Sequence, residues 1–347
     1  MDGFLALQVV RWQAQSGRHD LPWQNTRDPY RVWLSEIMLQ QTQVITVQAY
    51  FARFLARFPD VPALAQAPLD DVLHLWAGLG YYSRARNLHR CAQDVVRLHG
   101  GRFPKTAEQL QALPGIGRST AAAIAALCFG QRVAILDGNV KRVLTRYLGF
   151  GDDLAQAVNE RRLWDMATAL LPGEPTLKNM ARYTQGMMDL GATLCTSKKP
   201  ACRACPLAQR CVANALGSPE KFPNKTRKVK RSTQSIWLLW VVADDGSVWL
   251  SQRPTPGVWA GLYCLPLFED RQILSAVAGP ENEAGLRDLP PFKHVLTHKD
   301  LYLHPVLLSL RARRALPLEG QWFDGTQLAQ LGLPAPIKKL LTKPQQA

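Results

Sequence analysis

LPGIGRSTAAAIAAL, residues 113–127, lies between two helical patterns and decides how the first part of the chain folds. Gly115 and Gly117 allow positive φ and let a ligand approach the main chain closely. The helix that begins near Arg118 directs free N–H groups and the positive end of its dipole toward this turn. The stretch therefore predicts either an ordinary turn between two helices or a backbone site for a phosphate.

The formal net charge favours the phosphate interpretation. It is +15 in a chain of 347 residues, an excess typical of proteins that bind nucleic acid or an acidic membrane surface. No apolar run has the length of a membrane-spanning helix. The N-terminal stretch MDGFLALQVVRWQAQ lacks the basic start and unbroken apolar core of a signal peptide. A merely basic protein of the cytosol remains the alternative.

Helical patterns follow one another through the first two-thirds of the chain. Asp28 and Pro29 are typical of a helix start, and Thr106 and Gln109 have capping-box spacing. We find no alternation of apolar and polar residues in this part that is long enough to predict a strand. This part of the chain is therefore predicted to be mainly α.

The composition changes after the last helical pattern. Residues 217–235 are polar and basic with no apolar period, which predicts a linker. Beyond it, two runs rich in Val and Trp flank a DDG turn at residues 244–246, which is a hairpin signal. We expect a mainly α domain over residues 1–216 and an α+β domain over residues 236–347.

Four of the seven cysteines lie within one short loop, residues 195–211. Cys195, Cys202, Cys205 and Cys211 are separated by six, two and five residues. Four thiolates suit Zn²⁺ or an iron–sulfur cluster. Zinc sites usually use two close pairs, and this loop has one, so the spacing favours one [4Fe–4S] cluster per chain. The cysteines at positions 91, 128 and 264 lie in apolar or helical contexts typical of core residues.

Several motifs together carry a family resemblance. LPGIGRSTAAAIA, ILDGNVKRV (residues 135–143) and the four-cysteine loop resemble the helix–hairpin–helix DNA glycosylases of the endonuclease III superfamily. LPWQNTRDPYRVWLSEIMLQQTQV (21–44) and GLGYYSRARNLH (78–89) look like its adenine-specific MutY branch. LSQRPTPGVWAGLYCLPLF (250–268) is similar to the Nudix-like recognition domain of that branch. The resemblance implies a helix–hairpin–helix glycosylase domain with a [4Fe–4S] loop, followed by a Nudix-like domain.

The resemblance implies a monofunctional DNA glycosylase of base excision repair. Such an enzyme flips adenine out of a mispair with 8-oxoguanine or guanine in double-stranded DNA, hydrolyses it off and leaves an abasic site. We expect a monomer in the bacterial cytoplasm, associated with the nucleoid. The Nudix-like domain lacks the Glu-rich metal-binding helix of Nudix hydrolases, so we expect no nucleotide pyrophosphatase activity. The alternatives are an endonuclease III-like glycosylase/lyase for oxidised pyrimidines and a non-catalytic iron–sulfur DNA-binding or redox-sensing protein.

Three positions match the family's catalytic residues. Glu36 lies among apolar residues, which disfavour its charged form, and the match makes it the acid that protonates adenine. Asp137 would stabilise the positive charge that develops on the sugar; the alternative is that it is only a turn or cap residue, with Asn139 also able to cap the following helix. Ser119 stands where bifunctional members carry a nucleophilic lysine; we expect it to form a hydrogen bond near the sugar or Asp137, the alternative being a residue that only starts the helix. Since serine forms no imine, the strand is expected to stay intact.

Other matches concern the substrate. Trp23 and Gln185 match the adenine pocket beside Glu36. Gln41 and Tyr81 match residues that enter the DNA stack beside the orphan base opposite the flipped adenine, and Leu79 is expected to wedge alongside them. Gly115, Gly117 and Arg118 would hold a phosphate. Leu296, Thr297 and His298 stand where the family has a Phe-Ser-His loop that touches 8-oxoguanine, so the hydroxyl and imidazole are kept and the aromatic ring is lost. Arg84 and Arg86 are interpreted as phosphate contacts or, equally, as a basic helix face.

Overall fold

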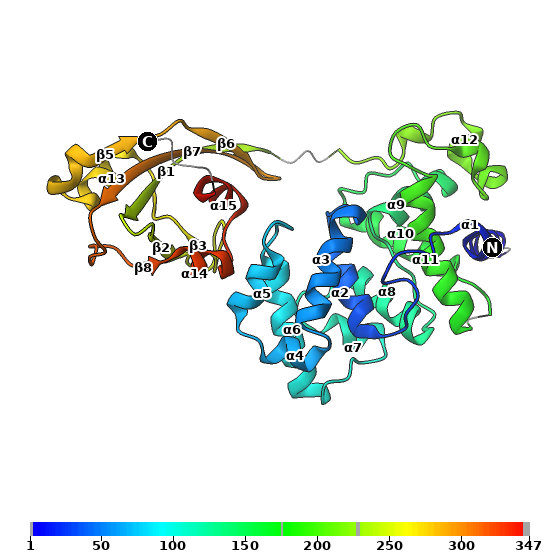
Figure 1. The fold of residues 1–347 in the computed structure, drawn as a ribbon. Coiled ribbons are helices and arrows are strands. Elements are labelled where there is room, and N and C mark those ends of the chain that lie inside the picture. Colours follow the sequence, from blue (N-terminus) through cyan, green and yellow to red (C-terminus); the bar gives the residue numbers. More distant parts are fainter. Residues whose placement is uncertain (1–2, 175, 227–229, 343–347) are drawn as a thin grey trace. The chain divides into compact units, whose positions relative to one another are not determined.

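The chain forms two compact units in a computed structural model, which describes residues 3–174, 176–226 and 230–342. The first unit comprises Met1–Gln66 and Arg90–Lys228, and the second comprises Ala67–His89 and Val229–Ala347 (Figure 1). Residues 227–229 of the predicted linker and 343–347 of the predicted second domain lie outside the described residues. The segment Ala67–His89, which we expected in the first domain, belongs to the second unit. The predicted domain boundaries stay a prediction.

The first unit is helical, and its described residues contain no strand. Its helices are α1 (Phe4–Ser16), α2 (Pro29–Leu39), α3 (Val44–Arg57), α4 (Val61–Gln66), the C-terminal part of α6 (Ser83–His99), α7 (Ala107–Gln111), α8 (Arg118–Phe129), α9 (Gly138–Leu148), α10 (Ala157–Ala169), α11 (Leu177–Thr193) and α12 (Val212–Ala215). Short 3-10 helices lie at η1 (Cys202–Ala204), η2 (Ala208–Arg210) and η3 (Pro219–Lys221). The mainly α prediction for this part is confirmed.

The predicted helix starts are confirmed where a side chain caps them. Asp28 accepts a hydrogen bond from the Tyr30 N–H at 2.9 Å, with Pro29 in the first position of α2. Thr106 Oγ1 accepts from the Gln109 N–H at 3.3 Å at the start of α7. Each cap satisfies an N–H group that has no partner inside the helix.

The turn before α8 is fixed by its apolar residues. Leu113 and Ile116 are buried, and the Ile116 N–H donates to the Leu113 carbonyl at 3.2 Å. Gly115 uses the positive φ that glycine allows, with φ 75°. Gly117 does not: it has φ −80° and is the extended N-cap of α8. Gly115, Gly117 and Arg118 are exposed, so the turn presents main chain to solvent.

Helix α11 packs against α1, α8 and α9 (Figure 1). Small residues allow this close packing. A Cβ atom added to Gly191 would lie 2.5 Å from the Cβ of Asn139, and one added to Gly186 would lie 2.7 Å from Cγ1 of Val9. Buried alanines of α8, Ala122, Ala123 and Ala126, belong to the same core. This packing brings α11 next to the first turn of α9.

The second unit contains the helices α5 (Leu69–Trp76), the start of α6, α13 (Arg271–Ala278), α14 (Gly325–Gln330) and α15 (Ala335–Leu341), with η4 (Pro280–Gly285). Its strands are β1 (Ser232–Ala243), β2 (Val248–Gln252), β3 (Tyr263–Cys264), β4 (Leu267–Phe268), β5 (Leu286–Asp288), β6 (Phe292–Val295), β7 (Lys299–Leu310) and β8 (Gln321–Phe323). The main order is β3-β2-β1-β7-β5, with β4 on β1, β6 on β7 and β8 on β2.

The long strands β1 and β7 run parallel at the centre of this sheet, and the other pairs are antiparallel. Leu239, Val241, Val306 and Leu308 of these two strands share a buried cluster with Leu274 of α13. The predicted hairpin at residues 244–246 is confirmed, since the Ala243 N–H donates to the Ser247 carbonyl at 2.9 Å and β2 follows directly. The α+β prediction is therefore confirmed.

Candidate functional site

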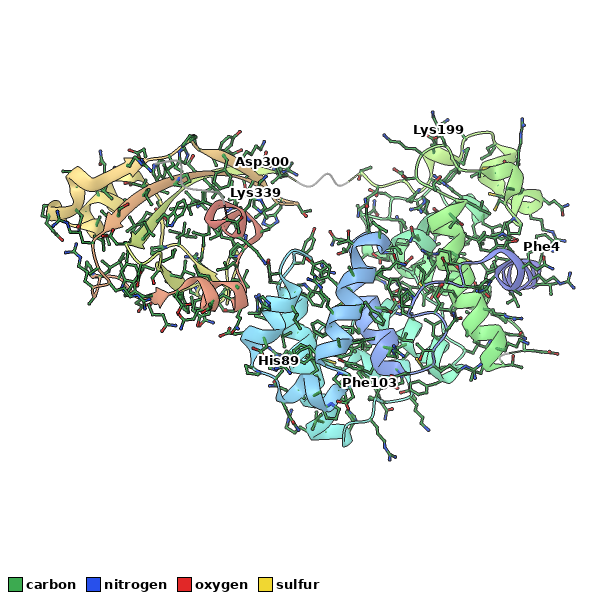
Figure 2. All side chains as sticks on the ribbon, in the orientation of Figure 1. Phe4, His89, Phe103, Lys199, Asp300 and Lys339 are labelled. Atoms are coloured by element: carbon green, nitrogen blue, oxygen red, sulfur yellow. The ribbon has the colours of Figure 1, made fainter. Side chains whose placement is uncertain are left out.

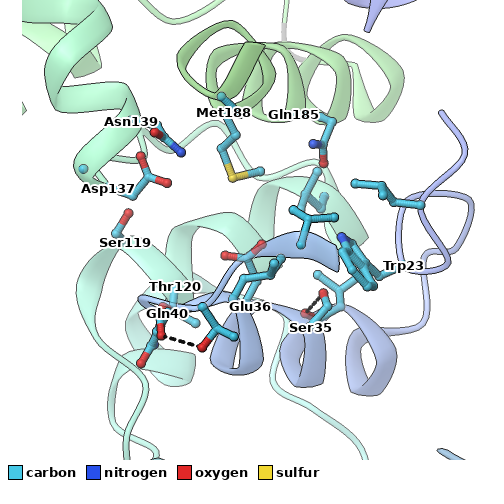
Figure 3. Close-up of a pocket in the computed structure, with 18 of the residues that line it drawn as sticks. Trp23, Ser35, Glu36, Gln40, Ser119, Thr120, Asp137, Asn139, Gln185 and Met188 are labelled. Carbon is cyan, nitrogen blue, oxygen red and sulfur yellow. Dashed lines mark hydrogen bonds between the residues drawn. The ribbon is translucent and has the colours of Figure 1, made fainter. Parts of the chain in front are cut away.

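A pocket of about 640 Å³ opens in the first unit among α2, α8, α9 and α11. It brings together residues that are far apart in the sequence. Glu36, Ser119, Asp137 and Gln185 all line it, with Trp23 at one side (Figure 3). These are the residues for which the family resemblance implies catalysis and adenine binding. Gln41 also lines the pocket; it is an exposed residue, and its backbone has φ 58°.

Glu36 lies on α2 between buried apolar neighbours. Ser35 and Ile37 on either side of it are buried, and its own side chain is partly buried at the pocket wall. Burial, and to a smaller extent the charge of Asp137, together raise the pKa of Glu36 from 4.5 to about 7. Near neutral pH this carboxyl therefore exists in both protonated and ionised forms, as a proton donor and acceptor must.

Asp137 is the N-cap of α9, and its carboxylate accepts a hydrogen bond from the Val140 N–H at 2.7 Å. The expectation that Asn139 caps this helix is wrong, because Asn139 lies inside α9 and its Oδ1 accepts from Arg142 Nη2 at 2.9 Å. Burial raises the pKa of Asp137, while backbone N–H groups and the charges of Arg142 and Lys141 act in the opposite direction. The helix dipole also favours the ionised form.

Ser119 lies in the first turn of α8, next to Asp137 on the same side of the pocket (Figure 3). Its Oγ accepts a hydrogen bond from the Leu136 N–H at 3.1 Å. Leu136 is the residue directly before Asp137, so the serine holds the segment that carries the carboxylate. A hydroxyl that accepts this bond keeps its own proton available for another acceptor.

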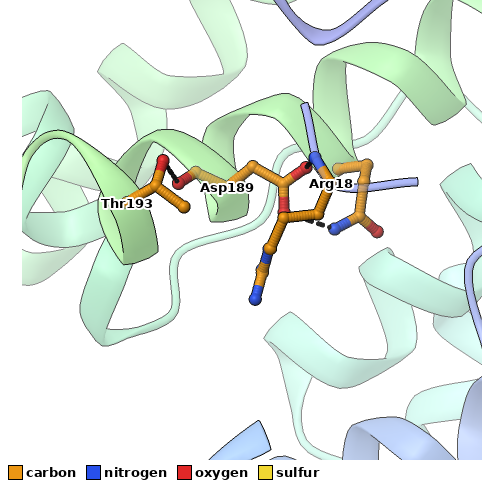
Figure 4. A network of polar contacts seen from close by, with 4 residues as sticks. Arg18, Asp189 and Thr193 are labelled. Carbon is orange, nitrogen blue, oxygen red and sulfur yellow. Dashed lines mark hydrogen bonds and ion pairs between the residues drawn. The ribbon is translucent and has the colours of Figure 1, made fainter. Parts of the chain in front are cut away.

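Gln185 is oriented by a network that the sequence did not reveal to us. Its Nε2 donates to Asp189 Oδ1 at 2.9 Å, and Arg18 Nε donates to the same oxygen at 2.7 Å (Figure 4). The Asp189 side chain has no exposed surface, and Thr193 donates to its main-chain carbonyl at 2.8 Å. The available signal was a carboxylate four residues after Gln185 within the apolar run MMDLGATL, one helical turn further along the same face.

The N-terminus of α8 is open to solvent. Its N-cap, Gly117, has no side chain to bond the first N–H groups, and the first backbone bond back to the turn is from Ala121 to the Gly117 carbonyl at 2.9 Å. A Cβ atom added to Gly117 would meet no protein atom within 4 Å. The fold itself therefore does not require glycine here. Arg118 stacks over the ring of Trp164 at 4.0 Å, which fixes its stem beside this turn.

The four-cysteine loop follows α11. Cys195, Cys202, Cys205 and Cys211 are partly buried and close enough for the charges of their thiolates to interact. Among the described residues, no three or more Cys, His, Asp or Glu side chains are arranged to hold a single metal ion. Each iron of a [4Fe–4S] cluster takes one thiolate, so the ligands of such a cluster stand farther apart than those of one Zn²⁺ ion.

A buried arginine stands beside these cysteines. Arg146 of α9 is 2 % exposed, and its Nη1 lies 3.3 Å from Cys195 Sγ. It also donates to the carbonyls of Thr196 at 2.6 Å and Ser197 at 3.1 Å. A buried cation suits a group that carries negative charge, as a thiolate-bound iron–sulfur cluster does. The donor set and this cation fit a [4Fe–4S] cluster.

In the second unit, another set of residues meets around a cavity of about 620 Å³. Tyr81, Thr297 and His298 line it together with Trp259 and His294. The hydroxyl groups of Tyr81 and Thr297 form a hydrogen bond across 216 residues of sequence. The structure thus joins the loop before α6 to the turn of the β6–β7 hairpin, two segments that the family resemblance assigned to the same lesion.

The residues around Tyr81 differ in exposure. Tyr81 is 41 % exposed with φ 47°, whereas Leu79 is only 6 % exposed. The structure therefore does not present Leu79 as a wedge. Arg84 is buried and its Nη2 donates to the carbonyls of Leu79 at 3.1 Å and Gly80 at 3.2 Å. The phosphate interpretation is wrong for Arg84, which shapes this loop. Arg86 Nη1 donates to the Ala260 carbonyl at 2.6 Å.

Backbone strain marks two of the predicted DNA-contacting residues. Among the described residues, the non-glycine positions with positive φ are Gln41, Tyr81, Lys199 and Trp259. Such conformations cost about 1–3 kcal/mol each and persist where the surroundings enforce them. Gln41 and Tyr81 are both exposed, so both strained positions are accessible to a ligand from solvent.

Comparisons with known proteins support two family assignments. Residues 34–167 match the HhH-GPD superfamily of base excision DNA repair proteins, and residues 237–343 match the NUDIX domain. The adenine DNA glycosylase of Buchnera aphidicola (strain APS) is 36 % identical over 338 residues, which cover 96 % of this chain and 95 % of that protein. The adenine DNA glycosylase of Mus musculus is 44 % identical, with 96 % and 76 % covered.

Solved structures support the helical fold. A thermostable thymine-DNA glycosylase matches with a TM-score of 0.55 at 29 % identity, covering 61 % of this chain and 95 % of that one. A non-covalent endonuclease III–DNA complex matches with a TM-score of 0.51 at 20 % identity, covering 62 % and 95 %. The second match concerns the fold alone. Within the described residues, no helix combines the length and apolar character needed to cross a membrane.

Proposed function

Because this chain belongs to the adenine DNA glycosylase family, whose members hydrolyse N-glycosyl bonds in base excision DNA repair, we propose that it excises adenine paired with 8-oxoguanine or guanine. The observation that carries the proposal is the pocket in which Glu36 and Asp137 interact while burial raises the pKa of Glu36 to about 7. The substrate is double-stranded DNA that contains the mispair. We further propose that the protein acts as a monomer on the DNA of the bacterial nucleoid.

In this mechanism the two carboxyl groups have different roles. Glu36, protonated near neutral pH, donates a proton to N7 of the flipped adenine and makes the base a better leaving group. Asp137, ionised at the start of α9, stabilises the oxocarbenium-like sugar as the bond breaks. Ionised Glu36 then accepts a proton from the incoming water. One buried acid and one charge-stabilised carboxylate supply the two protonation states that this reaction needs.

The flipped base would lie between Trp23 and Gln185. Trp23 is 7 % exposed and offers its indole as a pocket wall, edge-on to Phe51 with 5.4 Å between ring centroids. The Gln185 amide nitrogen is engaged by Asp189 at 2.9 Å, which leaves the amide oxygen to accept from the exocyclic amine of adenine. A thymine offers no such amine, so this contact supports selection of adenine.

We propose a monofunctional enzyme. Ser119 supplies no amine to attack the sugar, so the product is an abasic site in an uncut strand. Its bond to the Leu136 N–H at 3.1 Å gives it a role in holding the segment that ends at Asp137.

DNA contacts would come from both units. Gly115, Gly117 and Arg118 would hold a phosphate at the open N-terminus of α8. Gln41 and Tyr81 would fill the stack that the adenine leaves, since flipping costs a few kcal/mol of stacking and pairing. Thr297 and His298 would contact the opposite 8-oxoguanine. For Leu79 to act as a wedge, its buried side chain would have to become exposed when the protein binds DNA.

The cofactor we propose is one [4Fe–4S] cluster bound by Cys195, Cys202, Cys205 and Cys211. When bound, it cross-links the loop of residues 195–211 and carries no step of the base excision. Arg146 would offset its negative charge through the contact with Cys195 Sγ. The loop also carries Lys198, Lys199, Arg203 and Arg210, which would contact a phosphate backbone.

A panel of duplexes tests the proposal. We expect release of free adenine from A:8-oxoguanine and A:G duplexes and no release of thymine from T:G. Excision of thymine, or of an oxidised pyrimidine, with adenine untouched would overturn it. Binding without excision of any base would instead indicate the non-catalytic alternative.

A further inference from the structure

The turn of the β6–β7 hairpin is held by a residue of the preceding linker. Leu296, Thr297 and His298 form this turn, closed by the Leu296 N–H to the Lys299 carbonyl at 2.8 Å. Thr297 and His298 are exposed. A short exposed turn has few contacts of its own, so its conformation depends on what bonds its main chain.

Arg231 supplies most of those bonds. Its Nη1 donates to the Thr297 carbonyl at 3.1 Å and its Nη2 to the Leu296 carbonyl at 3.0 Å. The same guanidinium pairs with Asp300, which lies at the turn end of the hairpin (Figure 2). The next residue, Ser232, donates its N–H to the His298 carbonyl at 3.1 Å. Residues 231 and 232 therefore bind all three carbonyls of the turn.

The carboxylate in this network is also fixed from the other strand. Asp300 Oδ2 pairs with Lys293 Nζ at 2.7 Å, and Lys293 lies two residues before the turn-flanking Val295. The guanidinium of Arg231 reaches these partners from two separate nitrogens held in one rigid plane. A lysine carries its three donors on a single nitrogen at the end of a flexible chain, so it does not reproduce this spread of donors. The arrangement therefore favours arginine over lysine at position 231.

The turn so held is the one that meets Tyr81. With its main chain bonded to Arg231, Thr297 directs its hydroxyl to the hydroxyl of Tyr81. The backbone of Tyr81 is shaped in turn by Arg84, through the Leu79 and Gly80 carbonyls. Two arginines thus hold the two segments that we expect at the lesion. Arg231 donates to carbonyls of the turn that contains Thr297, and Arg84 donates to carbonyls of the loop before Tyr81.

We propose that Arg231 is a positioning residue for discrimination of the base opposite adenine, acting through the main chain of residues 296–298. This inference rests on the proposed function, in which that turn contacts 8-oxoguanine. Arg231 is 45 % exposed and Asp300 19 %, so solvent screens the ion pair and the charge attraction alone contributes little to stability. Its effect is on the shape of the turn and not on the stability of the domain.

The test compares two arginines in the same unit. Arg313 is also 45 % exposed and donates to Asp245 at 2.7 Å, at the β1–β2 turn. We expect R231A and R231K to lower the ratio of single-turnover rates for A:8-oxoguanine over A:G by about threefold to tenfold, the loss of roughly one hydrogen bond. R313A should keep the ratio of the unmodified protein. The A:G rate and the melting temperature should change little in all three variants.

A second measurement is independent of activity. Amide hydrogen exchange over residues 292–300 should become faster in R231A and R231K than in R313A, because the turn loses its carbonyl partners. An unchanged rate ratio together with unchanged exchange in R231A refutes the inference while leaving the proposed function intact. A protein that excises adenine from neither duplex refutes the proposed function, and the exchange experiment still decides whether Arg231 holds the turn.

Discussion

At the scale of single residues, Glu36 links activity to pH. Its pKa of about 7 follows first from burial and then from the charge of Asp137. If the protonated form is the acid, the single-turnover excision rate should fall about tenfold per pH unit above about pH 7. It should also fall in acid, where Asp137 becomes protonated. E36Q should lose excision at every pH; an E36Q protein that cleaves adenine normally contradicts the assignment.

The same residue links stability to pH. The pKa of Glu36 is higher in the folded protein than in the unfolded chain, so protonated Glu36 favours the folded state. This contribution to the free energy of unfolding is fully present below about pH 4.5 and is lost as the pH rises through about 7. E36Q is neutral throughout, so we expect it to raise the free energy of unfolding at about pH 8 by on the order of 2–3 kcal/mol. At about pH 4 the gain should vanish. Thermal denaturation of both proteins at the two pH values measures it; a gain that is equal at both excludes this origin.

Ser119 separates a structural from a covalent role. Removal of its hydroxyl leaves the Leu136 N–H without its acceptor, and Leu136 is 3 % exposed. We expect S119A to lose about 1–2 kcal/mol of stability and to retain excision. Borohydride should trap no covalent DNA complex with either protein. A complex that forms with the unmodified protein and is absent with S119A would contradict the monofunctional proposal.

At the scale of elements, the open start of α8 can be tested without disturbing the fold. A Cβ on Gly117 meets no protein atom within 4 Å, and its φ of −80° suits any residue. We expect G117A to change stability by about 1 kcal/mol or less and to weaken binding of the mispaired duplex about tenfold, as loss of one charge-assisted bond to phosphate would. Fluorescence anisotropy at fixed salt measures this.

Gly325 gives the matched control. It also begins a helix, α14, and has no atom within 4 Å of an added Cβ. G325A should leave DNA binding unchanged. Equal effects of the two substitutions, or none of either, would mean that no phosphate approaches Gly117.

Sequence reasoning predicted the elements whose structure depends on residues that are adjacent in the sequence. The caps at Asp28 and Thr106, the turn before Arg118 and the hairpin at residues 244–246 each depend on a few adjacent positions. Sequence could not decide the backbone at Gly115 and Gly117, because glycine permits positive φ without requiring it; the structure has positive φ at Gly115 and not at Gly117. At the start of α9, aspartate and asparagine are equally good caps in sequence, and only the backbone shows that Asp137 holds that position.

Contacts between distant segments lay beyond sequence reasoning. Arg18 and Asp189 are 171 residues apart, and Tyr81 and Thr297 are 216 apart. Charge and composition do not say which arginine meets which carboxylate or carbonyl. The resemblance to a family placed Tyr81 and Thr297 near one lesion, and it said nothing of Asp189 or Arg231, which act by orienting other groups.

At the scale of the whole molecule, the cysteine loop should couple cofactor content to DNA binding. Arg146 is 2 % exposed and lies beside Cys195. If the proposed cluster is lost, the negative charge that balances this buried cation is lost with it, which destabilises the loop. We expect C211S to contain less iron and acid-labile sulfide, to be cleaved by protease within residues 195–211, and to bind the mispaired duplex more weakly. C264S, at a buried cysteine of the second unit, should keep its iron. Full DNA binding by an iron-free protein would contradict this placing role.

The most direct test of the central claim follows both products of one reaction. A 5′-labelled duplex with adenine opposite 8-oxoguanine is incubated with excess protein, and free adenine and strand length are measured in the same samples. We predict that adenine appears while the strand stays full length, and that the strand breaks at that position only after alkali. A strand cut without alkali, or no free adenine, would contradict the account.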